Sequence, residues 1–277
     1  MVYALEGIGG TRIWTQADEG WTVIVPFHNE RGCIAATIAS LAAQTVRPLL
    51  VLVDNGSTDR SAEFAREACE RLNLAAIHLH EPRPGKVAAL QCGLRATSSP
   101  FVATCDADTI YPANYLELAG QLLADEGTVA AIAANCAVDA SPSTGRLAGL
   151  RLTLTARLLP QQCLNGGASQ VFRTRELKAC GGFDPAVWNW VLEDHEVMAR
   201  IEALGRIAYH RSFLCHPAQR PRATNCTGWT LSEQLRYHST RSHQRIGFFH
   251  DYLGPRLRQR ALPSERLRRE VVGLPHG

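Results

Sequence analysis

The sequence predicts an α/β fold in which an open, mostly parallel sheet is flanked by helices. Short runs of consecutive apolar residues recur in the first half of the chain, as expected of parallel strands that are covered on both faces. A helical pattern follows each run, so that strands return about every 25 to 30 residues, which is the spacing of βαβ crossovers. Polar clusters follow several of these strands directly, at the edge of the sheet where ligands bind.

Four strand and helix units are expected in the first half of the chain. The strands are expected at 22–26, 49–53, 75–79 and 101–105. The helices are expected at about 31–44, from the turn at 54–59 to about 72, at about 86–96, and from about 112. The second strand, Leu49–Val53, has five apolar residues without alternation, which is typical of a strand buried on both faces.

The second half is less regular. Strands are expected at 128–138 and ending at 173, and helices at 146–159 and 192–204. A boundary between a nucleotide-binding half and a second half is expected near 140–145, where small and turn-forming residues gather. Residues 1–20 are expected to be an N-terminal extension, 21–216 the main domain, and 217–277 a helical segment.

Composition and charge limit the class of protein. With 277 residues, 45% of them apolar and 20% charged, wholesale disorder is excluded. The longest apolar stretch without charge, Gly127–Val138, is shorter than the roughly 20 residues that span a membrane. No secretory signal is expected at the start. Residues 211–277 hold 12 arginines against four acids, which suggests an anionic partner for that end.

The nine cysteines include no C-x-x-C pair. Disulfide frameworks and thiolate zinc sites need closer, paired spacings. The nine cysteines are therefore predicted to be small buried thiols in a reducing cytosol.

The motif Asp106-Ala-Asp108 follows the fourth expected strand. Two carboxylates at this spacing can share a divalent cation, and hard oxygen ligands suit Mg²⁺ or Mn²⁺ holding a diphosphate. A plain acidic turn is the alternative.

Asp54 and Lys86 stand at the same predicted edge. The Asp54 carboxylate can accept the N–H of a nucleobase, and Lys86 at a helix start can meet phosphate. A simple Asn-Gly turn and a solvated lysine are the alternatives.

Glu193-Asp194 opens an expected helix beside two tryptophans. A carboxylate near an aromatic wall can act as a general base toward a hydroxyl, although acids in a first helical turn also complement the helix dipole. His216 ends the following strand and could complete a metal shell, with several other histidines competing for that role.

Taken in order, these motifs resemble those of the family 2 glycosyltransferases, which are inverting enzymes with the GT-A fold. The resemblance covers about residues 21–216. It is carried by Val25-Pro-Phe-His-Asn-Glu30, Val53-Asp-Asn-Gly-Ser-Thr-Asp59, Gly85-Lys-Val-Ala-Ala-Leu90 with Gly93, Asp106-Ala-Asp108, Gly167–Arg173, Gly181-Gly-Phe-Asp184 and Glu193-Asp194.

Carried over residue by residue, the resemblance implies a nucleotide pocket, a metal site and a catalytic base. The nucleotide would be held by Pro26, Glu30, Asp54, Lys86 and Asp106. Mg²⁺ or Mn²⁺ would be held by Asp106, Asp108 and His216. Asp194 would be the catalytic base, with Glu193 supporting it. On the acceptor side stand Gly167 and the two tryptophans, Trp188 and Trp190, which either stack on a sugar face or pack in the core.

The implied reaction is a direct displacement that moves one sugar from a nucleoside diphosphate sugar, UDP or dTDP being favoured, to a hydroxyl acceptor. Asn55 stands where the family often has a second acid, and the Gln-x-x-Arg-Trp motif of processive synthases is absent. The acceptor would be a saccharide or lipid-linked saccharide of cell-envelope or polysaccharide synthesis. The enzyme would be cytoplasmic, without nucleic acid, and its basic end would contact an anionic membrane peripherally.

Two other readings stay open. Asp106-Ala-Asp108-Thr109 also matches the D-x-D-x-T opening of the haloacid dehalogenase phosphatases, in which the first Asp is a nucleophile. The basic end could instead belong to a non-catalytic protein that binds nucleotide or an anionic surface, and its helical stretch 231–246 could simply pack on the body.

Overall fold

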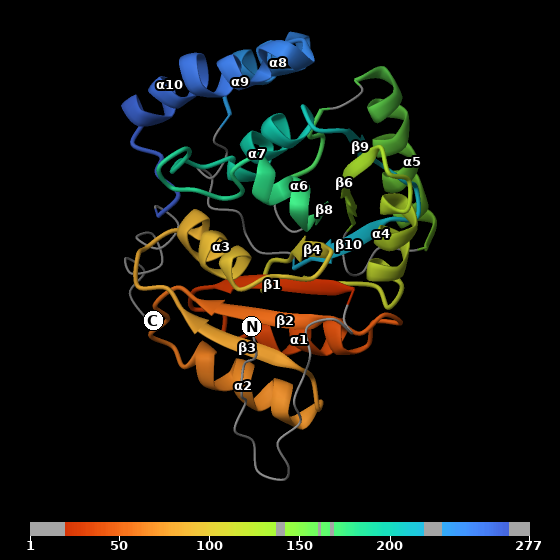
Figure 1. The fold of residues 1–277 in the computed structure, drawn as a ribbon, viewed down its shortest axis with the longest axis vertical. Helices are drawn as coiled ribbons and strands as arrows, with labels where there is room; N and C mark the ends of the chain where they lie inside the picture. The colour runs from red at the N-terminus through yellow and green to blue at the C-terminus, as the bar shows by residue number, and fades with distance from the viewer. Residues whose placement is uncertain (1–19, 137–141, 160–161, 167–168, 219–228, 266–277) are drawn as a thin grey trace.

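The computed structural model describes residues 20–136, 142–159, 162–166, 169–218 and 229–265. In this part of the chain a seven-stranded sheet carries helices on both faces (Figure 1). The strand order is β3-β2-β1-β4-β8-β6-β9. In that order the strands span Ala76–His80, Leu49–Asp54, Trp21–Phe27, Phe101–Thr104, Gln170–Arg173, Thr128–Ile132 and Arg206–Ala208. Only β8 runs antiparallel to its neighbours among these strands, so the predicted mostly parallel sheet is confirmed.

The first half of the chain forms the expected strand and helix units. Its helices are α1 (Ile34–Ala42), α2 (Ser61–Arg71), α3 (Lys86–Arg95) and α4 (Tyr115–Leu123). Successive residues of β1 enter different cores: Val23 and Val25 belong to the cluster on the α1 side, and Ile24 to the cluster on the α3 side. Because both faces are covered, the strands show no alternation in sequence.

The strand expected at 128–138 is wrong in extent. β6 ends at Ile132, and the chain then crosses to a second sheet of order β5-β10-β7. These short strands span Thr109–Ile110, Leu214–Pro217 and Ala134–Asn135. The crossing is held by two backbone hydrogen bonds, from Ala133 N–H to the Ser169 carbonyl and from Ala134 N–H to the Phe213 carbonyl. A continuous apolar run thus serves two sheets.

The described second half contributes three further helices to the body. They are α5 (Pro142–Leu158), α6 (Thr174–Ala179) and α7 (Glu193–Ile201). Since β8 pairs with β4 on one side and β6 on the other, both halves of the chain share the main sheet.

The described C-terminal part packs on the body as a helical layer. It comprises α8 (Leu231–Ser239), a 3₁₀ turn (Ser242–Gln244), α9 (Arg245–Gly247), a π-helical turn (Phe248–Leu253) and α10 (Gly254–Gln259). Phe249, Leu253 and Leu257 are fully buried against the loop that carries Trp188. Within the stretch 231–246, Tyr237 and Arg245 are buried as well, which agrees with packing on the body, one of the two hypotheses for this stretch. No helix of the described part is long and apolar enough to cross a membrane.

Candidate active site

One lysine and two acidic side chains meet at the carboxyl end of the sheet. Lys86 is the first residue of α3, Asp106 follows β4, and Glu193 begins α7. Lys86 Nζ lies 2.7 Å from Asp106 Oδ1 and 3.6 Å from Glu193 Oε1. A pocket here is lined by Pro26, Lys86, Leu90, Thr104, Cys105, Asp106, Gln170, Phe183, Glu193 and Asp194. The structure thus brings together five of the residues that the sequence assigned separately.

The charges of this cluster set its protonation. Burial alone would lower the pKa of Lys86, but the nearby charges of Asp106 and Glu193 outweigh it and raise that pKa above its usual range. Burial raises the pKa of Glu193 to about 7, with Lys86 opposing this shift and Asp194 adding to it. Burial also opposes ionisation of Asp194, yet His195 and Lys86 together hold its pKa well below the usual range. Asp194 is therefore a carboxylate at neutral pH.

Several neighbours fix the Asp194 carboxylate. Its Oδ1 accepts the His195 backbone N–H at 2.8 Å and lies 2.9 Å from His195 Nδ1. Gln170 Nε2 donates to the Asp194 backbone carbonyl at 3.1 Å. Gly166 lies directly against Asp194 Oδ2, where a Cβ atom would overlap the carboxylate. The sequence assigned no role to these three neighbours, although Gln170 lies in the Gly167–Arg173 motif and His195 stands next to the predicted base.

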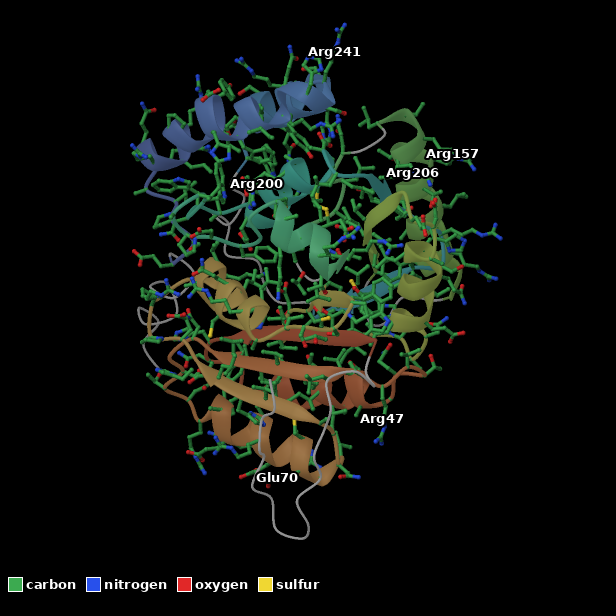
Figure 2. All side chains as sticks on the ribbon, viewed as in Figure 1. Arg47, Glu70, Arg157, Arg200, Arg206 and Arg241 are labelled. Carbon is green, nitrogen blue, oxygen red and sulfur yellow. The ribbon has the colours of Figure 1, made fainter. Side chains whose placement is uncertain are left out.

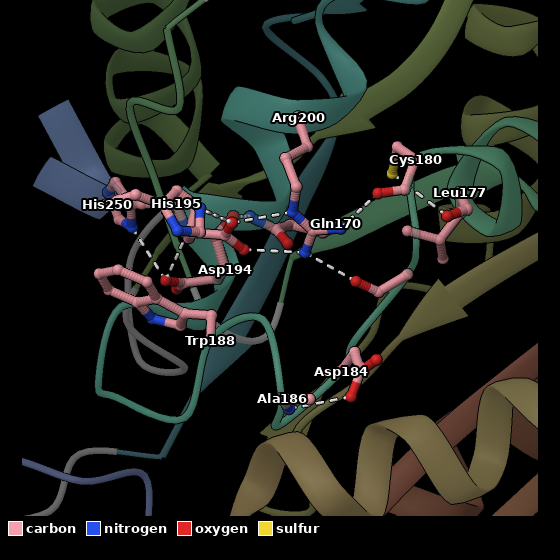
Figure 3. A network of polar contacts seen from close by, with 12 residues as sticks. Gln170, Leu177, Cys180, Asp184, Ala186, Trp188, Asp194, His195, Arg200 and His250 are labelled. Carbon is pink, nitrogen blue, oxygen red and sulfur yellow. Dashed lines mark hydrogen bonds and ion pairs between the residues drawn. The ribbon is translucent and has the colours of Figure 1, made fainter. Parts of the chain in front are cut away.

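A buried ion network anchors α7 (Figure 3). Glu196, 1% exposed, binds Arg200 through two contacts of 2.8 Å and His250 Nε2 at 2.9 Å. Arg200 also donates to the backbone carbonyls of Cys180 and Gly182 at 2.5 and 2.7 Å. Burial opposes ionisation of Glu196, but the hydrogen bonds and charges of His250 and Arg200 lower its pKa. The network connects the helix that carries Asp194 to the loop at Gly181 and Gly182, the Gly-Gly loop, and to the C-terminal layer.

On the nucleotide side, Asp54 ends β2 and holds the turn that follows. Its Oδ1 accepts the Ser57 backbone N–H at 2.8 Å, and its Oδ2 lies 3.3 Å from His80 Nδ1. Pro26 lines the pocket, whereas Glu30 lies in the loop after β1, where its backbone N–H donates to Ser61 Oγ at 2.7 Å.

The departure at Asn55 has a structural reason. Its side-chain N–H₂ donates to the Glu81 and Arg83 carbonyls at 3.0 and 2.8 Å, and its Oδ1 accepts the Gly85 N–H at 2.9 Å. An ionised aspartate only accepts hydrogen bonds, so it could not make this clamp. Asn55 thus fixes the loop that leads into Lys86.

Asp108 lies in the turn just before β5, and His216 lies on the neighbouring strand β10. β10 pairs with β5 so that His216 is opposite Ile110, and the Ala218 N–H donates to the Asp108 carbonyl at 2.8 Å. His216 Nδ1 lies 3.2 Å from the Cys136 carbonyl. Within the described ranges, no three His, Cys, Asp or Glu side chains form a group that could hold a metal ion. The expected set of Asp106, Asp108 and His216 is therefore not assembled as a three-residue cage. Two carboxylates do fit a Mg²⁺ or Mn²⁺ ion whose remaining ligands come from a diphosphate and water.

The two tryptophans that were expected on the acceptor side differ in burial. Trp188 is 3% exposed and packs edge to face on Phe249 at 5.6 Å between ring centroids, so it is a core residue and not a sugar platform. Trp190 is partly buried, and its backbone pairs with Pro263. Gly167 lies outside the described residues.

Comparisons with known proteins agree with this arrangement. The family model described as "Glycosyl transferase family 2" matches residues 22–175. An uncharacterized glycosyltransferase of Escherichia coli, YibD, is 32% identical over 111 residues, which are 39% of this chain and 32% of that protein. The succinoglycan biosynthesis protein ExoU of Rhizobium meliloti is 31% identical over 105 residues, 38% of this chain and 30% of that protein. The match thus spans about a third of these curated relatives.

Solved structures show the same fold. A mannosyltransferase from Pyrobaculum calidifontis in complex with GDP-Man and Mn²⁺ superposes with a TM-score of 0.64 at 23% identity, covering 84% of this chain and 69% of that one. TarS residues 1–349 of S. aureus, in complex with UDP-GlcNAc, superpose with a TM-score of 0.54 at 17% identity, covering 84% and 71%. The GT-A fold expected from the resemblance is confirmed.

Proposed function

The chain belongs to glycosyl transferase family 2, and on that basis we propose that it moves one sugar from a nucleoside diphosphate sugar to an acceptor hydroxyl with inversion at the anomeric carbon. The convergence of Lys86, Asp106 and the pair Glu193-Asp194 on one pocket carries this proposal. A cation that meets phosphate and a carboxylate that takes a proton are the two groups that such a displacement requires. Because the chain belongs to this family, a glycosyltransferase is favoured over the phosphatase and the non-catalytic binding protein.

Asp194 is the proposed general base. It is ionised at neutral pH and held in one orientation by His195 and Gly166, so it is ready to take the proton of an acceptor hydroxyl. As that oxygen attacks the anomeric carbon, the bond to the diphosphate breaks on the opposite side. Glu193 precedes this base in the chain and lies 3.6 Å from Lys86 Nζ, where it supports the base.

Lys86 and the two aspartates receive the leaving diphosphate. Asp106 and Asp108 would hold Mg²⁺ or Mn²⁺, which neutralises the diphosphate charge when bound. Lys86 is held in its charged form and lies 2.7 Å from Asp106, so it adds a second positive charge at the same place. Solved relatives of the same fold that contain Mn²⁺ support this assignment.

UDP or dTDP is the proposed nucleotide, and a saccharide or lipid-linked saccharide is the proposed acceptor. Asp54 lies at the end of β2, where its carboxylate can accept a pyrimidine N–H. Two relatives support an acceptor of polysaccharide or cell-envelope synthesis: the succinoglycan biosynthesis protein ExoU, and a protein of Edwardsiella ictaluri named undecaprenyl-phosphate 4-deoxy-4-formamido-L-arabinose transferase, which is 34% identical over 97 residues.

Calorimetry and thermal shift with UDP, dTDP and GDP, each with and without Mn²⁺, test the donor site. We expect one diphosphate to bind in a metal-dependent way to the wild type, and Asp108→Ala to lose that dependence. Asp251→Ala, an exposed acid of the C-terminal layer, is the control and should bind like the wild type. Binding of none of the three nucleotides would sink the proposal.

A further inference from the structure

Helix α5 turns its glycines inward and four of its five leucines outward. Gly145 and Gly149 are buried, and a Cβ at Gly149 would overlap the backbone carbonyl of Arg211. On the opposite side, the exposed fractions 47, 44, 48 and 81% belong to Leu147, Leu150, Leu154 and Leu158. At about 100° per residue these leucines lie within an arc of about 80°. A surface helix ordinarily places its large apolar residues toward the core, so this leucine stripe has an outward use.

The charges around the leucine stripe are of one sign. Arg146, Arg151 and Arg157 are exposed on both sides of it, and the sequence 142–158 contains no Asp or Glu. Figure 2 shows Arg157 extending away from the body. Leucines flanked by arginines on a helix are typical of segments that lie in the headgroup region of a bilayer.

We propose that α5 docks through its leucine stripe on the surface of an anionic lipid bilayer. Two copies of the chain meeting through the same stripe would bring their arginines together without an acid to offset them, which disfavours a dimer through this face. Phosphate headgroups supply the negative charge that the helix lacks, and the acyl boundary accepts the leucines.

Described residues that follow α5 in the chain lie close to the proposed base. Beyond α5, Gln162 binds His238 at the end of α8 through contacts of 2.7 and 3.1 Å, and Gly166 lies against Asp194. Two further exposed leucines, Leu231 and Leu235, lie on α8 at 80 and 72% exposure. A bilayer in contact with α5 would therefore lie near the chain segment that leads to the base. The docking does not depend on the proposed reaction.

Vesicle flotation of the full chain tests the proposal. The wild type should float with vesicles of phosphatidylcholine and phosphatidylglycerol, and less with phosphatidylcholine alone. The double variant L150Q/L154Q keeps good helix formers and should lose binding about tenfold or more. Arg151→Gln should weaken binding to anionic vesicles by about fivefold. Leu204→Gln, a leucine of similar exposure outside the leucine stripe, is the matched control and should bind as the wild type does.

Three results would overturn the docking. They are no flotation of the wild type, equal flotation of L150Q/L154Q, and a lower melting temperature of that variant, which would show that the chain itself covers the leucine stripe. A dimer in sedimentation velocity that L150Q/L154Q abolishes would assign this face to a second copy instead. Nucleotide binding of the same variants is a separate readout, so failure of the docking and failure of the proposed function are distinguishable.

Discussion

Glu193 and Asp194 are adjacent carboxylates whose surroundings move their pKa values in opposite directions. Glu193 is buried beside another acid, which favours its protonated form, whereas Asp194 is held against His195 and near Lys86, which favours its ionised form. Two neighbouring acids with separated pKa values can take different parts in one reaction. The proposed proton acceptor is Asp194, the one of the two that is fully ionised at neutral pH and that His195 holds in place.

We expect Asp194→Asn to lower kcat by a factor of about 10² to 10⁴, because an amide cannot take the acceptor proton. Nucleotide binding should be retained, since Asp54 and Lys86 are unchanged. The release of nucleoside diphosphate from the sugar donor measures the first effect, and calorimetry the second. Asp125→Asn, an exposed acid, serves as the control. A variant that keeps full turnover would remove Asp194 from the mechanism.

Glu193 should make stability depend on pH. Its pKa rises from the ordinary 4.5 to about 7 in the fold, so its contribution is complete below pH 4.5 and is lost as the pH rises through about 7. Relative to Glu193→Gln, the wild type should lose about 3 kcal/mol of unfolding free energy across this interval. Urea unfolding at a series of pH values measures the difference. Parallel curves for the two proteins would contradict it.

At the scale of elements, α7 is placed by a network that reaches three parts of the chain. Glu196 and Arg200 pair within the helix, Arg200 binds the Gly-Gly loop, and His250 reaches Glu196 from the C-terminal layer. The position of Asp194 at the start of α7 therefore depends on contacts made two and six residues later, by Glu196 and Arg200. Contacts made within a helix can thus fix the position of a residue in its first turn.

Arg200→Met should destabilise the fold by about 3 to 5 kcal/mol, because Glu196 would keep its buried charge with His250 as the remaining partner in the network. The matched control is Arg206→Met, whose exposed pair with Asp125 contributes less than about 1 kcal/mol. Chemical denaturation gives both values. Equal losses for the two variants would mean that the network does not hold α7.

At the scale of the whole molecule, the C-terminal layer belongs to the fold. Phe249 and Leu257 are fully buried, and Arg245 makes a buried ion pair with Glu202. Arg260 adds two contacts of 2.9 Å to Glu233, the residue that closes the capping box of α8. Two arginines of this end, Arg245 and Arg260, are thus engaged in ion pairs within the fold.

A chain ending at Leu253 should unfold at a much lower temperature than the full chain, because it lacks Leu257 and the Arg260 contacts. A chain ending at Glu265 keeps these contacts and should melt close to the full-length value. Calorimetric melting of both compares them directly. If the shorter chain melts like the full one, the layer does not stabilise the body. The longer truncation is also the suitable one for testing whether residues 266–277 bind membrane.

The candidate site could be predicted from the sequence where its polar side chains stand at the ends of strands. Asp54, Lys86 and Asp106 each stand at a turn next to a buried apolar strand or at a helix start, and a parallel sheet brings such ends to one edge whatever the loops do. Glu193-Asp194 required the ordered set of motifs as well, since no strand of the first half leads to it. The positions of Trp188 and Gly166 depended on which segment packs beside them, and local sequence carries little of that information.

By itself, the sequence determined which segments form strands and which polar residues follow each of them, because apolar runs and the turn residues after them are local properties. Only the tertiary structure decided that Lys86 pairs with Asp106 and Glu193, that Asn55 clamps the loop before α3, and that the basic end covers Trp188. These contacts join residues 20 to more than 100 positions apart or select one of two readings of a segment. Such choices are fixed by the burial and charge that a folded neighbour supplies.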